Sequence, residues 1–391
     1  MINYVIIFTI ALIISLILTP LVKKIAYRIR ALDIPNERKV HDTQIPRLGG
    51  IAVYLGFMAV FYGTVFYFWE SKGLFADKIT FLRGFAIGSL VIVVLGAADD
   101  IIGLRPLFKL LLQLVAGIIV YAHGLQIKMV EMPYLGELDL GLWGFPFTLF
   151  WIAGITNALN LIDGLDGLAT GVTFIASMIL FLISLSQDNL ETALFSAVLG
   201  GCLVGFLKYN FNPAQIFLGD SGALFLGFSL ANFSVLGAMK SSTAVALLIP
   251  IIALGFPIMD TLLAIVRRTF RVLRNREGLS ALRKIGDADK EHVHHKLMDL
   301  GYTHRGAVLV LYTLCLIFGI FAFILTTYRN EVAGAILFFV GLIVFVFVRT
   351  LGYLEFRGLK EGNFLEQYLS RFKGRQLSSQ DKGAKSPQRK D

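Results

Sequence analysis

The chain has 391 residues, of which 56% are hydrophobic and 16% are charged, and its formal net charge is +9. An ordinary soluble domain carries about 25% charged residues, so this composition excludes a water-soluble globular protein. Apolar runs of about 20 residues also exclude an outer-membrane barrel, whose strands are shorter and alternate in polarity. The chain is predicted to be an all-α, polytopic helical membrane protein.

Apolar windows long enough to cross a bilayer predict about eleven transmembrane helices. Their approximate ranges are 2–21, 48–69, 79–98, 107–123, 142–161, 168–186, 190–207, 221–238, 243–266, 307–327 and 331–350. The first run has no cleavage pattern after it, so we expect it to remain as a span. We expect one membrane domain over residues 1–350, and a cytoplasmic tail over 351–391 made of an interfacial helix and a disordered end.

The distribution of positive charge predicts the orientation. Alternating the eleven spans places 30 of the 36 Lys and Arg residues on one side. By the positive-inside rule this side is the cytoplasm, so the N-terminus faces out and the C-terminus faces the cytoplasm. We therefore expect a multi-pass membrane protein. The same charge suits an anionic substrate, although fixing the topology is a sufficient reason for much of it.

Polar residues from three separate segments converge on the predicted cytoplasmic face. Asp99 and Asp100 directly follow the third span, and Asp220 lies in the segment FNPAQIFLGDSGA. The segment NALNLIDGLDGLATG contributes Asn157, Asn160, Asp163, Gly164 and Asp166. Ionisable groups beside hydrocarbon are costly and are kept mainly where they have a function. We expect the site to be formed by the loops 22–47, 99–106, 162–167, 208–220 and 267–306.

An acidic cluster of this kind favours a hard divalent cation. A single Asp beside a helix end is usually a cap, but an adjacent Asp pair together with the sequences DGLDG and GDSG favours a ligand site. Oxygen ligands without cysteine indicate Mg²⁺, with Mn²⁺ as the alternative. The helices that begin after these acids would point free N–H groups at the same place, which suits phosphate.

A second cluster, in the segment 267–306, is rich in histidine and includes His292, His294 and His295. Imidazoles can bind zinc, but neither an HExxH motif nor a cysteine partner is present, so donation to phosphate oxygens fits better. A structural loop is the third interpretation. The first cytoplasmic loop, DIPNERKVHDTQIPRLGG, is either a positively charged anchor or a substrate contact, and both interpretations stay open.

Five motifs in this order make the chain similar to the polyprenyl-phosphate N-acetylhexosamine-1-phosphate transferases. The motifs are PRLGG, the pair Asp99–Asp100, NALNLIDGLDGLATG, FLGDSGA and HVHH. The resemblance implies a ten- or eleven-span enzyme of the bacterial cytoplasmic membrane whose site opens to the cytoplasm. Such enzymes transfer a sugar 1-phosphate from a UDP-sugar to undecaprenyl phosphate and release UMP, with Mg²⁺ or Mn²⁺ as cofactor.

The histidine motif also resembles one branch of this family. The HxHH form followed by THR is similar to the branch that uses UDP-N-acetylglucosamine and primes teichoic acid or O-antigen-type polymers. Val293 interrupts the three consecutive histidines expected of the phospho-N-acetylmuramoyl-pentapeptide transferase, which is the alternative within the family. From a different class, the alternative is an ion-coupled transporter that uses the acids as a relay.

The resemblance assigns roles residue by residue. Asp220 resembles the principal metal ligand, with Asp163 and Asp100 completing the site, and Asp99 and Asp100 resemble the pair that assists the lipid phosphate. The residues that resemble the nucleotide pocket are Asn157, Asn160, Asp163, Gly164, Asp166 and Phe217, and those that resemble the phosphate-contacting loop are His292, His294 and His295. We expect the lipid bilayer and the two substrates as partners and no nucleic acid, and a homodimer is compatible with this expectation.

Overall fold

The computed structural model describes residues 3–33, 44–72, 75, 78–132, 136–240, 251–252, 254–262, 293–328, 334–346 and 349. The chain separates into two compact units, Met1–Ile336 and Leu337–Asp391. Of the second unit, residues 337–346 continue an apolar helix, Gly334–Val346. The predicted tail helix and disordered end, 351–391, lie outside the described residues.

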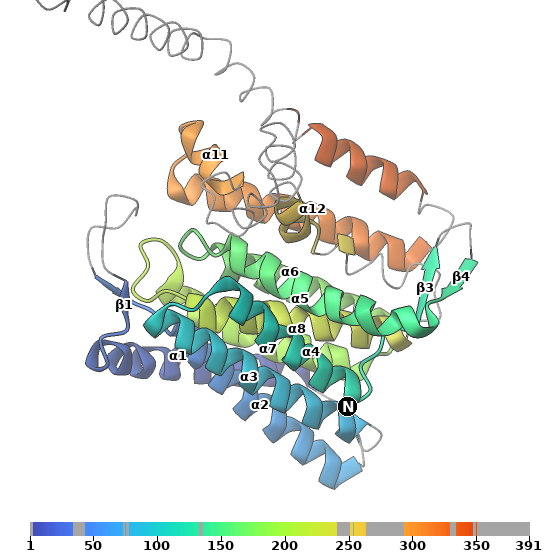
Figure 1. Ribbon diagram of the computed structural model, residues 1–391, viewed down its shortest axis with the longest axis horizontal. Helices are drawn as coiled ribbons and strands as arrows, with labels where there is room; N and C mark the ends of the chain where they lie inside the picture. The colour runs from blue at the N-terminus through green and yellow to red at the C-terminus, as the bar shows by residue number, and fades with distance from the viewer. Residues whose placement is uncertain are drawn as a thin grey trace, which may run out of the picture. The chain divides into compact units, whose positions relative to one another are not determined.

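The first unit is built from helices, as predicted. The helices are α1 Tyr4–Arg28, α2 Gly49–Lys72, α3 Ile79–Ile102, α4 Pro106–Ala122, α5 Gly144–Ile162, α6 Leu168–Ser186, α7 Leu190–Asn210, α8 Gly219–Lys240, α11 Val293–Asp299 and α12 His304–Tyr328. Two short antiparallel ribbons join some of them, β1 Leu32–Asp33 with β2 Ile45–Pro46 and β3 Met129–Met132 with β4 Gly136–Asp139. Figure 1 shows α1 to α8 side by side, with one ribbon at each end of the group.

The membrane class is confirmed by the lengths and compositions of these helices. Among the described residues, seven helices are long and apolar enough to cross a membrane, and these are α1, α2, α3, α5, α6, α7 and α12. The helix α4 is apolar but shorter. The predicted total of eleven spans and the sides of the two termini stay predictions, since most of the range 243–266 lies outside the described residues.

The helix α8 is the centre of the first unit. Every residue from 221 to 236 is buried, and α8 packs against α2, α3, α5, α6 and α7. Large rings fill the space around it, and the centroids of Phe195 and Phe233 lie 4.3 Å apart. Aromatic pairs of this kind add about 0.5–1.5 kcal/mol beyond the area that they bury.

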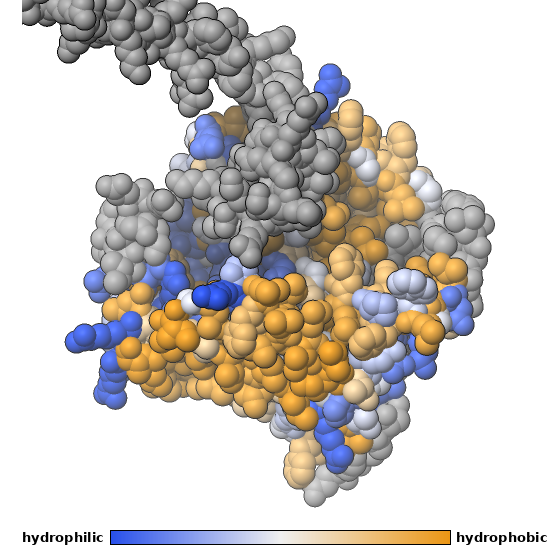
Figure 2. Space-filling view, viewed as in Figure 1, coloured by the Kyte–Doolittle hydropathy of each residue, from blue (hydrophilic) through white to orange (hydrophobic). Residues whose placement is uncertain are grey.

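The outward faces of the peripheral helices are apolar. Figure 2 shows a broad hydrophobic surface across the middle of the visible face, with hydrophilic residues toward the ends of the helices. Exposed side chains include Leu90 and Val94 of α3 and Leu111 and Val115 of α4. A stable soluble protein rarely exposes such a surface, whereas lipid tails solvate it.

One close helix contact positions the site. A Cβ atom on Gly50 would lie 2.0 Å from the Cα of Gly222, so only glycine lets the start of α2 approach the start of α8 this closely. The backbone N–H of Gly50 donates to the carbonyl of Leu218 at 2.8 Å. This contact places the PRLGG segment beside the FLGDSGA segment, although about 170 residues of sequence separate them.

Candidate active site

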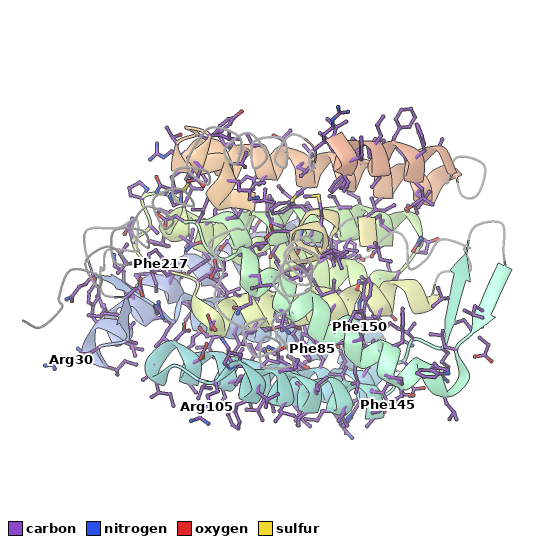
Figure 3. The ribbon with its side chains drawn as sticks, turned by 45° about the horizontal axis from the view of Figure 1, so that its top comes forward. Arg30, Phe85, Arg105, Phe145, Phe150 and Phe217 are labelled. Atoms are coloured by element: carbon purple, nitrogen blue, oxygen red, sulfur yellow. The ribbon has the colours of Figure 1, made fainter. Side chains whose placement is uncertain are left out.

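The predicted site residues gather at one end of the helices. The C-terminal ends of α3 and α5 and the N-terminal ends of α4 and α8 meet there, since a short segment reverses the chain between α3 and α4 and side-chain hydrogen bonds join α4 to α5 and to α8. Figure 3 shows Phe217, Arg30 and Arg105 toward this end and Phe145 and Phe150 toward the other.

Asp100 caps the N-terminus of α8. Its two carboxylate oxygens accept hydrogen bonds from the backbone N–H groups of Asp220 at 2.9 Å and Ser221 at 3.0 Å. Gly219 has a φ of +74°, and a Cβ there would lie 2.6 Å from a carboxylate oxygen of Asp100. The glycine before Asp220 is therefore needed both for the turn and for the approach of Asp100.

Lys109 joins the carboxylates of Asp99 and Asp220. Its Nζ donates to Oδ2 of Asp99 at 2.6 Å and to Oδ2 of Asp220 at 2.8 Å. Oδ1 of Asp99 accepts a hydrogen bond from the backbone N–H of Leu104, which lies in the short segment between α3 and α4. Two acids from distant segments are thus held together by one ammonium group, and the side chain of Asp220 is still 30% exposed.

Asp163 lies at the C-cap of α5, within electrostatic reach of this cluster. Burial raises its pKa well above the ordinary value, and the negative charges of Asp220, Asp100 and Asp166 raise it further. The positive charge of Arg47 acts in the opposite direction. Asp163 therefore faces the same acidic centre from a third segment of the chain, as the sequence predicted.

Asn157 pairs with a residue of α4. The amides of Asn157 and Gln113 donate to each other, with a distance of 3.3 Å from Gln113 Nε2 to Asn157 Oδ1. Gln113 is 1% exposed. Because a buried amide without a partner is unfavourable, this pair fixes the side chain of Asn157 one turn before Asn160.

Asp166 ties two loops together. Its Oδ2 accepts hydrogen bonds from Nδ2 of Asn212 at 2.9 Å and from the backbone N–H of Ala214 at 3.0 Å. The backbone N–H of Asp166 donates to Nε2 of His304 at 2.9 Å. The loop between α5 and α6 is thereby fixed against the loop before α8 and against the start of α12.

For the remaining predicted site residues the structure describes little beyond their exposure. Asn160 and Phe217 are half-buried and Gly164 is exposed. His292 and the side chains of His294 and His295 lie outside the described residues, so their predicted roles stay predictions. The backbone of α11 is anchored, since the N–H of Val293 donates to Oδ1 of the buried Asp260 at 3.0 Å.

The donor chemistry fits a hard divalent cation. The three predicted metal ligands, Asp220, Asp163 and Asp100, supply oxygen atoms only, and the pKa of Asp163 is raised first by burial and then by the negative charges of neighbouring acids, which a cation would offset. Among the described residues, no three acid, histidine or cysteine side chains already surround one common point. Mg²⁺ usually keeps several waters and binds substrate phosphates, so a site built from few protein ligands suits it.

The sequence patterns do not single out Lys109 and Gln113, and they include Arg47 only as part of the first cytoplasmic loop, for which a substrate contact is one of two open interpretations. Lys109 contributes to the positive-inside count, and Gln113 falls within the predicted apolar span 107–123. A signal was available, because Lys109 and Gln113 are four residues apart on a helix and therefore share one face of an otherwise apolar segment. A polar face on such a helix points toward protein interior rather than lipid.

Comparisons with known proteins agree with these motifs. Residues 82–238 match the sequence model of glycosyl transferase family 4. A probable undecaprenyl-phosphate N-acetylglucosaminyl 1-phosphate transferase of Bacillus subtilis is 42% identical, over 83% of this chain and 86% of the relative. A decaprenyl-phosphate N-acetylglucosaminephosphotransferase of Mycobacterium tuberculosis is 35% identical, over 77% of each chain. A phospho-N-acetylmuramoyl-pentapeptide-transferase of Clostridium kluyveri is 38% identical, over 43% of this chain and 55% of the relative.

Proposed function

Because the chain belongs to the family of polyprenyl-phosphate N-acetylhexosamine-1-phosphate transferases, we propose that it transfers N-acetylglucosamine 1-phosphate from UDP-N-acetylglucosamine to undecaprenyl phosphate and releases UMP. The family expected from the five motifs is confirmed. The donor sugar follows the two relatives that match over at least 77% of the chain, and the pentapeptide transferase matches over only 43% of it. The product would initiate a cell-envelope polymer.

The observation that carries the proposal is the meeting of Asp99, Asp100 and Asp220 at one end of the helices, with Lys109 between two of them. The reaction brings two polyanions together, so Coulomb repulsion between phosphates is the main obstacle. Phosphoryl transfer otherwise depends on positioning and on stabilising charge. A fixed cluster of acids, with one ammonium and the N-terminus of α8, supports both tasks.

The chain's own groups have distinct tasks in this proposal. Asp100 fixes the start of α8 and thereby the backbone of Asp220. Lys109 orients the carboxylates of Asp99 and Asp220, and an ammonium has a third N–H that can donate to a phosphate oxygen. Asp99 accepts the remaining proton of the lipid phosphate, a slight task because the second phosphate pKa is about 6.

Asp220, Asp163 and Asp100 would hold the cofactor, Mg²⁺ or Mn²⁺. When bound, this ion supplies positive charge to the pyrophosphate oxygens. His292, His294 and His295 would donate to phosphate oxygens from the cytoplasmic loop. The charge distribution along the chain supports a site that faces the cytoplasm in a bacterial cytoplasmic membrane.

The test is release of UMP from UDP-N-acetylglucosamine by the purified full chain. We expect release to require both undecaprenyl phosphate and Mg²⁺, and we expect Asp220→Asn to lower it by about 100-fold or more. Asp188→Asn is the matched control, since Asp188 is exposed in the turn between α6 and α7. Turnover with the muramoyl-pentapeptide donor but not with UDP-N-acetylglucosamine would assign the chain to the other branch, and no turnover with either would reject the proposal.

A further inference from the structure

Arg47, in the PRLGG motif, is held from one side by the β1–β2 ribbon. The ribbon pairs Leu32 with Pro46 and Asp33 with Ile45, and the backbone N–H of Arg47 donates to the carbonyl of Ala31 at 3.0 Å. This pairing brings Arg47 to Asp33, whose carboxylate accepts a hydrogen bond from Nη2 of the guanidinium. Asp33 is buried, at 5% exposure, whereas the side chain of Arg47 is 36% exposed.

The same segment is held from the other side by the loop before α8. The N–H of Phe217 donates to the carbonyl of Pro46 at 2.9 Å, and the N–H of Gly49 donates to the carbonyl of Phe217 at 3.0 Å. Leu48 between them is buried and has a φ of +74°, a conformation rare outside glycine. A backbone fixed in this way on both sides leaves Arg47 little freedom to move away from the acidic cluster.

The segment of Arg47 lies beside the acids, because the backbone hydrogen bonds of Pro46, Gly49 and Gly50 join it to residues 217–218, directly before Gly219 and Asp220. The charge of the guanidinium interacts with both Asp163 and Asp100, which come from α5 and α3. A guanidinium has five N–H donors. Toward the residues that the structure describes, Arg47 uses Nη2, and its Nε and Nη1 donate no hydrogen bond.

We propose that Arg47 binds a phosphate group of a substrate at the rim of the acidic cluster, and that Asp33 is a positioning residue that holds the guanidinium there. This inference rests on the proposed function and identifies a ligand contact within it. A planar guanidinium with unused donors matches phosphate geometry, and a half-exposed position is open to a ligand. The phosphate belongs either to the lipid acceptor or to the nucleotide donor, and both sources share this chemistry.

A purely structural role for Arg47 predicts a different result. If the ion pair with Asp33 only held the ribbon, removing it would lower stability and leave the KM of each substrate unchanged. A phosphate contact predicts a change in the KM of one substrate. The two roles are therefore separated by measuring thermal stability and both KM values on the same variants.

The experiment compares Arg47→Gln, Arg47→Lys and Asp33→Asn with the wild type, each as the purified full chain with lipid acceptor. We expect Arg47→Gln to raise one KM about 10-fold or more, Arg47→Lys to restore part of the loss, and Asp33→Asn to raise the same KM by less. Arg83→Gln is the matched control, since Arg83 is exposed on α3 and lies outside the segments expected to form the site.

The outcomes distinguish the two phosphate sources and the two proposals. A higher KM for undecaprenyl phosphate assigns the contact to the lipid, and a higher KM for UDP-N-acetylglucosamine assigns it to the nucleotide. Unchanged values of both KM in Arg47→Gln would overturn the inference while leaving the proposed function intact. If Arg47→Gln does not fold, Arg47→Lys and Asp33→Asn decide the question in the same way. A wild type without turnover rejects the proposed function, and binding of UDP and of undecaprenyl phosphate vesicles to the same variants then tests Arg47 separately.

Discussion

The ammonium of Lys109 lies 2.8 Å from Oδ2 of Asp220, although 111 residues separate them in the chain. The same nitrogen also donates to Asp99, so one cation compensates two acids that would otherwise repel each other. The relationship makes Lys109 part of the candidate active site rather than a topology signal.

Replacing Lys109 should therefore remove activity. We expect Lys109→Met to lower kcat/KM for UMP release by about 100-fold or more, because Asp99 and Asp220 lose their shared donor. Lys109→Arg keeps the charge but not the compact geometry, so we expect an intermediate loss. Lys128→Met, at an exposed site between α4 and β3, is the control. Wild-type activity in Lys109→Met would exclude the role proposed here.

Alanine variants of two glycines with positive φ distinguish the effect of backbone strain from the effect of damage to the site. Gly219 and Gly103 have φ values of +74° and +66°, but a Cβ would meet Asp100 only at Gly219 and nothing within 4 Å at Gly103. We expect both alanine variants to lose about 1–2 kcal/mol of stability from the left-handed conformation. Only Gly219→Ala should also lose activity. Thermal unfolding and UMP release measured on both variants check this, and equal activities would contradict it.

Divalent-cation binding should depend on pH through Asp163. Its pKa is raised by burial and by neighbouring acids, so the carboxyl holds a proton to a higher pH than usual and a cation must displace it. Affinity for Mn²⁺ should be greatest above this raised pKa and fall by up to about tenfold per pH unit below it. Stability of the metal-free protein should change in the opposite sense, declining as the pH rises through the pKa of Asp163.

Titration of Mn²⁺ followed by electron paramagnetic resonance at several pH values checks this dependence. Asp163→Asn is the matched variant, because it keeps the shape of the side chain and cannot ionise. We expect weaker binding in that variant and a smaller change across the same pH range, with the remaining change due to Asp220, whose pKa burial raises to about 7. An affinity of the wild type that does not vary with pH would show that Asp163 is not a ligand.

Gln113 should act through Asn157. The two amides donate to each other, so removing Asn157 takes both hydrogen bonds from Gln113, whereas removing Gln113 leaves Asn157 the bond from its Nδ2 to the carbonyl of Ala153 at 2.8 Å. We expect Asn157→Ala to raise the KM for UDP-N-acetylglucosamine by about 5- to 10-fold and Gln113→Ala by less. In a double-mutant cycle the combined change should be smaller than the sum of the single changes. Additive changes in free energy would show that the pair is not coupled.

Most of the helices could be predicted from the sequence. The ranges 168–186 and 190–207 correspond closely to α6 and α7, because the hydrocarbon thickness sets the length of an apolar run. The convergence of Asp99, Asp100 and Asp220 was also predicted, since each acid stands at the same predicted face. The tilt and neighbours of each helix could not be predicted, so nothing in the sequence connects α4 with α8 through Lys109.

Hydropathy and charge by themselves determined that this is a helical membrane protein, and motif order determined its family. Hydropathy and charge decide for each segment separately whether it crosses the bilayer and in which direction. The order of the motifs can be seen in the sequence without any knowledge of the fold. Only the tertiary structure decided which polar groups become partners: Lys109 with Asp220, Gln113 with Asn157, and Asp33 with Arg47. Such pairs depend on how close two helices or loops approach, and that distance is set by packing around the buried α8, where small residues such as Gly50 and Gly222 allow the contact.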